Sequence, residues 1–151
     1  MTEWSLVACV IVVLGLIFFR QVRVLQGRGE LAAVRATLGA LRTALVIDYL
    51  HKKIGSGNIS LPPAQRNPFE LLDRQPVNYL GSLKAADLET AAAGSWLFDS
   101  VCDCVGYVPL YSQWFVSPSG DMVAWYRLSG EPGPLQLTAR EAYVWQDELM
   151  N

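Results

Sequence analysis

The stretch Trp4–Phe19, WSLVACVIVVLGLIFF, decides the fold, because it is a long uninterrupted run of residues without a charge. Arg20 ends the run, but the helical pattern of apolar residues continues to Lys53. We therefore expect one long N-terminal helix. The uncharged run is shorter than the ~20 residues that cross a bilayer comfortably. An arginine side chain can reach toward the headgroups, and residues 22–25 lengthen the apolar surface, so we predict a transmembrane or assembly half over residues 1–25.

The second half of this helix, residues 26–54, has an apolar stripe instead of a uniform apolar surface. The members of the stripe recur at intervals of three and four residues, which places them on one helix face: Leu31, Val34, Leu38, Leu41 and Leu45. This spacing predicts that the amphipathic half packs on a head domain, and a second hypothesis adds packing on other copies of the helix. Gly27 and Gly29 each weaken a helix by about 1 kcal/mol relative to Ala, so we expect a bend or local melting between the halves.

Residues 55–151 are expected to form a globular head, with a loop region over 55–94 and a β-sheet over 95–146. In the loop region, Asn67-Pro68-Phe69-Glu70 predicts a short helix with Asn67 as N-cap, and Leu83–Ala93 has room for another turn or two. Ten of the sixteen aromatic residues lie beyond Gly94 and favour a sheet there. The strand candidates are Ser95–Asp99, Gly106–Tyr111, Met122–Leu128 and Ala142–Gln146.

These elements predict an α+β fold, in which the long N-terminal helix packs on a small antiparallel sheet of about four strands. Thr138–Glu141 matches a capping box, but the strand-like residues after it favour a turn or bulge. The aromatic cluster Tyr111, Trp114, Phe115, Trp125 and Tyr126 is typical of a sheet core, with an exposed binding patch as the alternative.

The charge of the chain is divided between its two parts. Residues 1–54 hold seven Lys/Arg and three Asp/Glu, whereas residues 55–151 hold five Lys/Arg and eleven Asp/Glu. The head is therefore acidic, which argues against a nucleic-acid partner. The basic stem favours contact with lipid headgroups or with the acidic heads of neighbouring copies.

The sequence offers no constellation of catalytic residues, so we do not predict an enzyme, a cofactor or a metal site. His51 is the only histidine and follows the pattern of a capping charge at a helix end. Asp99 and Asp103 are too few to predict a calcium site. Cys102 and Cys104 are separated by one residue, and both a disulfide in an oxidising compartment and two free thiols stay open.

The chain resembles type IV pilins and the pseudopilins of type II secretion systems. Met1-Thr2 followed by the apolar run 6–16 with its Gly15 is similar to the family's N-terminal pattern. In the head, a second series is similar to one found in some pilin-like proteins of Gram-negative bacteria: Asn67-Pro-Phe-Glu-Leu-Leu72, Asn78-Tyr-Leu-Gly81 and Gly94-Ser-Trp-Leu-Phe-Asp99.

The resemblance implies a structural subunit that assembles through its N-terminal helix, with Leu6, Val10, Val13, Gly15 and Ile17 on the assembly surface. It also implies N-terminal processing and methylation at Met1 or Thr2. The expected partners are other pilin or pseudopilin subunits, an inner-membrane assembly platform and membrane lipid. The expected location is the inner membrane in a single pass, with the head in the periplasm or, within a filament, outside the cell.

Two features depart from the family pattern. Members usually carry a Glu at the fifth mature residue, where this chain has Ser5 or Leu6, which resembles a minor or tip subunit more than the repeating one. Arg20, Arg23 and Arg28 follow the apolar run, and the positive-inside rule would place the head in the cytoplasm. The alternative function is therefore a single-pass membrane scaffold or regulator with a cytoplasmic head that enters no filament.

Overall fold

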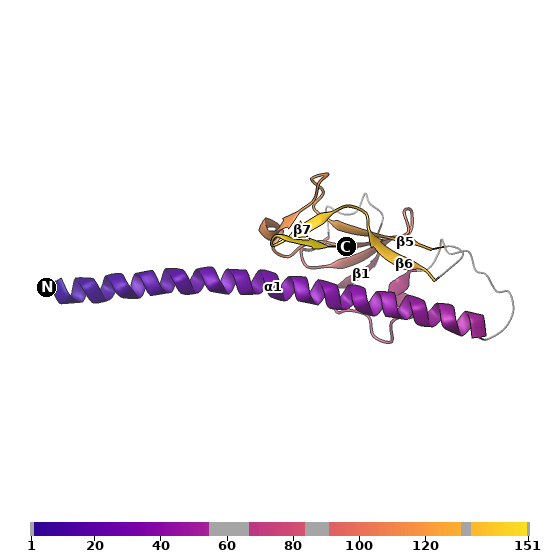
Figure 1. Cartoon of the computed structure of the whole chain (residues 1–151), viewed down its shortest axis with the longest axis horizontal. Helices are drawn as coiled ribbons and strands as arrows, with labels where there is room; N and C mark the ends of the chain where they lie inside the picture. The colour runs from indigo at the N-terminus through magenta and orange to yellow at the C-terminus, as the bar shows by residue number, and fades with distance from the viewer. Residues whose placement is uncertain (1, 55–66, 84–90, 131–133, 151) are drawn as a thin grey trace.

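The computed structural model describes residues 2–54, 67–83, 91–130 and 134–150. Helix α1 (Thr2–Ile54) is one continuous α-helix of 53 residues. At 1.5 Å per residue it is about 80 Å long. Its first half projects away from the head and its second half lies along the head (Figure 1). The expected local melting at Gly27 and Gly29 is wrong, because α1 runs through both glycines without a break. Figure 1 shows α1 as a gently curved helix, not a sharply bent one.

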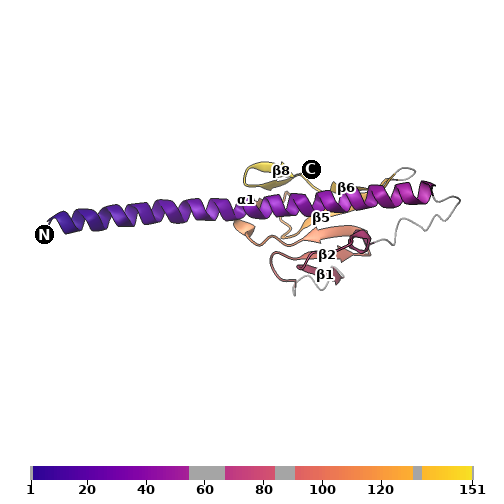
Figure 2. The same cartoon turned by 90° about the horizontal axis from the view of Figure 1, so that it is seen from below.

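The head contains two sheets. The larger one has the strand order β1-β2-β3-β5-β6, formed by β1 (Tyr79–Ser82), β2 (Trp96–Asp99), β3 (Cys104–Tyr107), β5 (Ala124–Ser129) and β6 (Gln136–Ala139). The smaller one has the order β4-β7-β8, formed by β4 (Phe115–Val116), β7 (Tyr143–Trp145) and β8 (Glu148–Met150). Figure 2 shows α1 crossing over the strands of both sheets.

The α+β class is confirmed, and four neighbouring strands of the larger sheet, β2, β3, β5 and β6, pair antiparallel. The head is not one antiparallel sheet, however. Strand β1 pairs with β2 in parallel, so the larger sheet is mixed, and the small sheet is separate from it. Strand β1 lies in the segment that was expected to be a loop, and β8 lies beyond residue 146. The strand expected over 106–111 is shifted to Cys104–Tyr107. Strand β6 includes Thr138 and Ala139, where a turn or bulge was expected.

The short helix predicted after Asn67 is present as the 3-10 helix η2 (Pro68–Leu71). The Asn67 side chain accepts a hydrogen bond from the Phe69 amide at 3.1 Å, which is the predicted N-cap. Pro68 occupies the first turn, where its missing N–H has no cost. The additional helical turns expected over 83–93 fall mostly on residues outside the described ranges.

The apolar stripe packs on the head, as predicted. All five of its side chains are at most 4% exposed and belong to one core cluster with aromatic residues of both sheets. Among these partners are Trp96, Tyr107, Tyr126, Tyr143 and Trp145. The helix therefore completes the core of the head, and the two sheets reach each other through side chains that also contact α1.

Candidate functional site

The N-terminal half of α1 is an apolar rod that nothing in the described chain covers. Every large apolar side chain from Trp4 to Phe19 is exposed. Four of the five assembly residues, Leu6, Val10, Val13 and Ile17, recur at intervals of four, three and four residues and share one face. The helix is long and apolar enough to cross a membrane by length and composition, and it is the only such helix among the described residues.

Gly15 does not share that face. The rotation of 100° per residue places it on the opposite side of α1 from Leu6, Val10, Val13 and Ile17. A Cβ added at Gly15 would contact nothing within 4 Å among the described residues. Met1 lies outside the described residues, and Thr2 is the first residue of α1, so predicted processing at these positions remains a prediction.

The helix enters the head at Gly27, where backbone and head approach closely. The Gln146 side chain donates a hydrogen bond from Nε2 to the carbonyl of Val24 at 3.2 Å. The backbone N–H of Gln146 also donates a hydrogen bond to the backbone carbonyl of Trp114 at 2.9 Å. This bond connects the β7–β8 turn to the 3-10 helix η4 (Ser112–Trp114). A Cβ added at Gly27 would lie 2.1 Å from Gln146 Nε2 and 2.9 Å from Trp114 Cδ1. Only glycine therefore allows this contact.

One turn further along, Glu30 attaches α1 to the head through hydrogen bonds. Its side chain is buried, and its two carboxylate oxygens accept three hydrogen bonds. The donors are the Tyr107 hydroxyl at 3.0 Å, the Leu110 amide at 2.5 Å and the Tyr111 amide at 3.1 Å. Burial raises the pKa of Tyr107, and the charge of Glu30 raises it further, so the phenol keeps the proton that it donates.

Two arginines that lie beside the stripe tie α1 to the head at further points. Arg42 donates from Nε and Nη2 to the carbonyl of Leu137 on β6, at 3.2 and 3.1 Å. Arg35 forms an ion pair with Glu148 on β8 at 2.7 Å, and both side chains are about half exposed. An exposed pair of this kind contributes about 0–1 kcal/mol, so Glu30 and the stripe carry most of the attachment.

Cys102 and Asp103 lie in the turn between β2 and β3, and Cys104 begins β3. The two sulfur atoms of Cys102 and Cys104 are joined as a disulfide with a Cα–Cα distance of 5.2 Å. In the same turn, Asp103 has a positive φ of 52°, and burial and the nearby Asp99 raise its pKa. Among the described residues, no group of three or more His, Cys, Asp or Glu side chains is placed to hold a metal ion.

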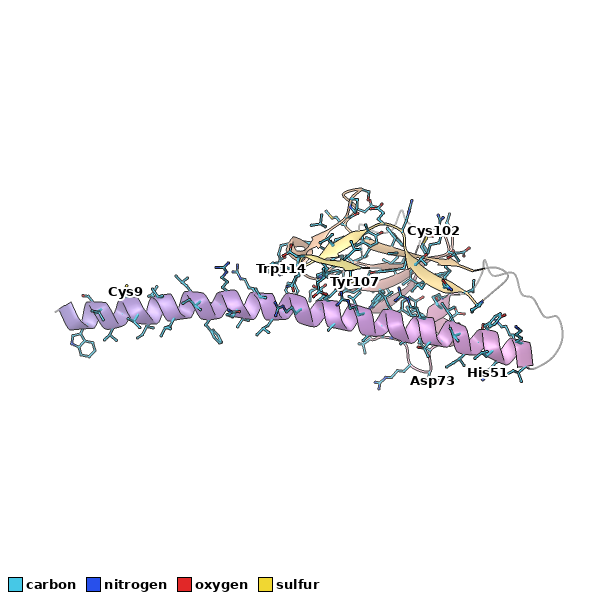
Figure 3. The ribbon with its side chains drawn as sticks, viewed as in Figure 1. Cys9, His51, Asp73, Cys102, Tyr107 and Trp114 are labelled. Atoms are coloured by element: carbon cyan, nitrogen blue, oxygen red, sulfur yellow. A yellow bond between two sulfur atoms is a disulfide. The ribbon has the colours of Figure 1, made fainter. Side chains whose placement is uncertain are left out.

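The other residues that the sequence singled out are dispersed. His51, Lys52 and Lys53 lie in the last turn of α1, as expected of charges that favour a helix C-terminus. Figure 3 shows His51, Cys102 and Trp114 far apart. In the aromatic cluster, Trp125 and Tyr126 are buried, whereas the other three members are only half-buried.

Sequence reasoning missed Glu30 and Gln146. Glu30 was detectable in principle, because it directly precedes Leu31 and lies on the buried side of the amphipathic half. Gln146 could not be found in this way, since its contact with Val24 joins residues 122 positions apart.

No family model, curated protein or solved structure matches the chain.

We predict that Glu30→Ala destabilises the attachment of helix to head. The substitution leaves one hydroxyl and two amides without their acceptor, and each such group costs about 1–3 kcal/mol when it stays buried. We expect the free energy of unfolding of the full chain in detergent micelles to fall by roughly 3 kcal/mol or more. Denaturant unfolding monitored by tryptophan fluorescence measures this change. Arg35→Ala is the control and should change it by less than about 1 kcal/mol. Equal effects of the two substitutions would contradict the assigned role of Glu30.

A matched pair of glycine substitutions tests the close approach at Gly27. Gly29→Ala meets nothing within 4 Å and should stabilise α1 by about 0.5–1 kcal/mol through helix propensity. Gly27→Ala gains the same propensity but displaces the Gln146 and Trp114 side chains. We expect its thermal midpoint to lie below that of Gly29→Ala. Equal midpoints would show that the head adapts to the extra methyl without loss.

Proposed function

We propose that this chain is a minor, pilin-like structural subunit of a type IV pilus or a type II secretion filament. One observation carries the proposal: a single continuous helix is exposed and apolar over its first half and built into a head over its second half. A small domain does not need a helix of about 80 Å for its own core. The exposed half is thus available for lipid and for the helices of other subunits.

For assembly, the exposed half of α1 must pass directly from lipid to the helices of neighbouring subunits, without exposure to water. Burial of a Val, Leu, Ile or Phe side chain is worth about 1.5–3 kcal/mol relative to exposure in water. Twelve large apolar residues between Trp4 and Phe19 are exposed, so a passage of the helix through water would cost tens of kcal/mol. The subunit is therefore held in the inner membrane, and an assembly platform transfers the helix from lipid to its neighbours.

The attachment of the head to α1 suits this role. Glu30, Gln146 and Arg42 connect α1 to the head in addition to the buried stripe, so a force that moves the helix also moves the head. Contacts between unlike surfaces of successive subunits do not close on themselves and give an open helical array.

The alternative is a single-pass membrane scaffold or regulator with a cytoplasmic head. Arg20, Arg23 and Arg28 favour it, because positive charge after the apolar segment is typical of the cytoplasmic side. A reporter fused to the C-terminus separates the two functions. We expect alkaline phosphatase activity from a head in the periplasm, and fluorescence of a cytoplasmic reporter would support the scaffold instead.

We predict that Val12→Asp abolishes incorporation into filaments. Val12 is 60% exposed on the apolar rod, and a carboxylate there would be buried without a partner between packed helices. Incorporation is measured as the subunit recovered in purified filaments relative to the amount in the membrane fraction, which separates assembly from insertion. Val77→Asp is the matched control, because it adds the same charge at a fully exposed position of the head. Normal incorporation of Val12→Asp would refute assembly through burial of the apolar rod.

A further inference from the structure

A groove lies where the apolar rod of α1 meets the underside of the head. It is lined by Leu16, Phe19, Arg20, Arg23, Val24 and Trp114. Five of these residues come from α1 and follow one face of the helix over about two turns. Trp114 comes from η4 and forms the wall on the side of the head, as its position in Figure 3 shows. The groove thus has an apolar end, a doubly cationic middle and an aromatic wall.

The wall has a fixed position relative to the helix. The carbonyl of Trp114 accepts a hydrogen bond from the Gln146 amide, and the Gln146 side chain donates to the carbonyl of Val24. The absence of a side chain at Gly27 lets the indole approach the helix backbone. These contacts place Trp114 one turn above Arg23, so the fold fixes the aromatic wall of the groove.

The charges of the groove lie at the depth of lipid headgroups. Arg20 is the first charged residue after the uncharged segment 4–19, and Arg23 follows about 4.5 Å further along the axis. The headgroup region of each leaflet is on the order of 5–8 Å thick. When the apolar segment lies in the hydrocarbon core, both guanidinium groups therefore reach the headgroups. Arg28 is about 12 Å beyond Arg20 and lies outside that layer.

The chemistry of the lining selects an anionic lipid. Within the described residues, neither Arg20 nor Arg23 forms an ion pair, so both charges are available to a ligand. A guanidinium group binds phosphate oxygens through two parallel hydrogen bonds. Leu16 and Phe19 lie on the membrane side of the arginines and provide an apolar surface for an acyl chain.

We propose that this groove binds one anionic glycerophospholipid, with its phosphate between Arg20 and Arg23, an acyl chain along Leu16 and Phe19, and its polar headgroup against Trp114. The proposal goes beyond filament assembly and rests only on the insertion of the apolar segment into a membrane. It applies to either orientation of the head. The phosphate of the bound lipid offsets one of the two arginine charges and fixes the height of the head above the bilayer.

Native mass spectrometry of the full chain tests the proposal. The protein is purified in detergent micelles that contain equal amounts of phosphatidylglycerol and phosphatidylcholine, and the lipids that stay bound are identified. We expect one retained phosphatidylglycerol in the unmodified protein. Arg20→Gln and Arg23→Gln should each lower the ratio of bound phosphatidylglycerol to phosphatidylcholine by about fivefold.

Two further variants separate a built site from general attraction between charges. Arg28→Gln removes the same charge from the same helix outside the groove, and we expect the lipid ratio to stay unchanged. Trp114→Leu leaves the charge unchanged and should lower lipid retention roughly threefold, because the aromatic wall is lost. Circular dichroism of each variant confirms that the head is folded.

Three results would overturn the proposal. The first is a lipid ratio near one in the unmodified protein. The second is an equal loss for Arg28→Gln and the groove variants, which would indicate only diffuse attraction. The third is displacement of the lipid by millimolar inorganic phosphate, which would indicate a simple anion site. None of these results affects the filament assay with Val12→Asp, so the two proposals fail independently.

Discussion

The carboxylate of Glu30 holds the helix and the head in one arrangement. It is the only carboxylate between Glu3 and Asp48, and it lies where α1 changes from an exposed to a buried element. A buried carboxylate is unfavourable unless its oxygens are satisfied, and here a phenol and two backbone amides satisfy them. Apolar packing along the stripe allows a helix to slide or rotate by small steps. Three directed hydrogen bonds to one side chain permit only one register.

The end of the head that lies nearest the apolar rod contacts the same part of α1. Gln146 and Trp114 meet α1 at Val24 and Gly27, one turn before Glu30. The β7–β8 turn that carries Gln146 contains two residues with positive φ, Gln146 at 49° and Asp147 at 65°. Non-glycine residues adopt this conformation at a cost, which the surrounding contacts must offset. The junction between α1 and the head therefore has one defined conformation, and this conformation positions the Trp114 wall of the groove.

The sequence predicted the helix and its stripe because both depend on local periodicity. The intervals between Leu31 and Leu45 define a face without reference to the rest of the chain. The cap at Asn67 was predictable for the same reason, since it joins residues two positions apart. Strand β1 was missed because its four residues, YLGS, alternate weakly and include a glycine. Its parallel pairing with β2 depends on the path of the chain between them, and no local pattern encodes that path.

Helix α1 also affects how the sheets can associate. A free sheet edge exposes unpaired N–H and C=O groups that can pair with another chain. At β6, an edge of the larger sheet, Arg42 occupies the Leu137 carbonyl through two hydrogen bonds. At the opposite edge, β1 has only four residues and an irregular register, and β4 and β8 have only two and three residues. Neighbouring copies therefore have little opportunity for strand-to-strand aggregation, and association between them is left to the apolar rod among the surfaces of the described residues.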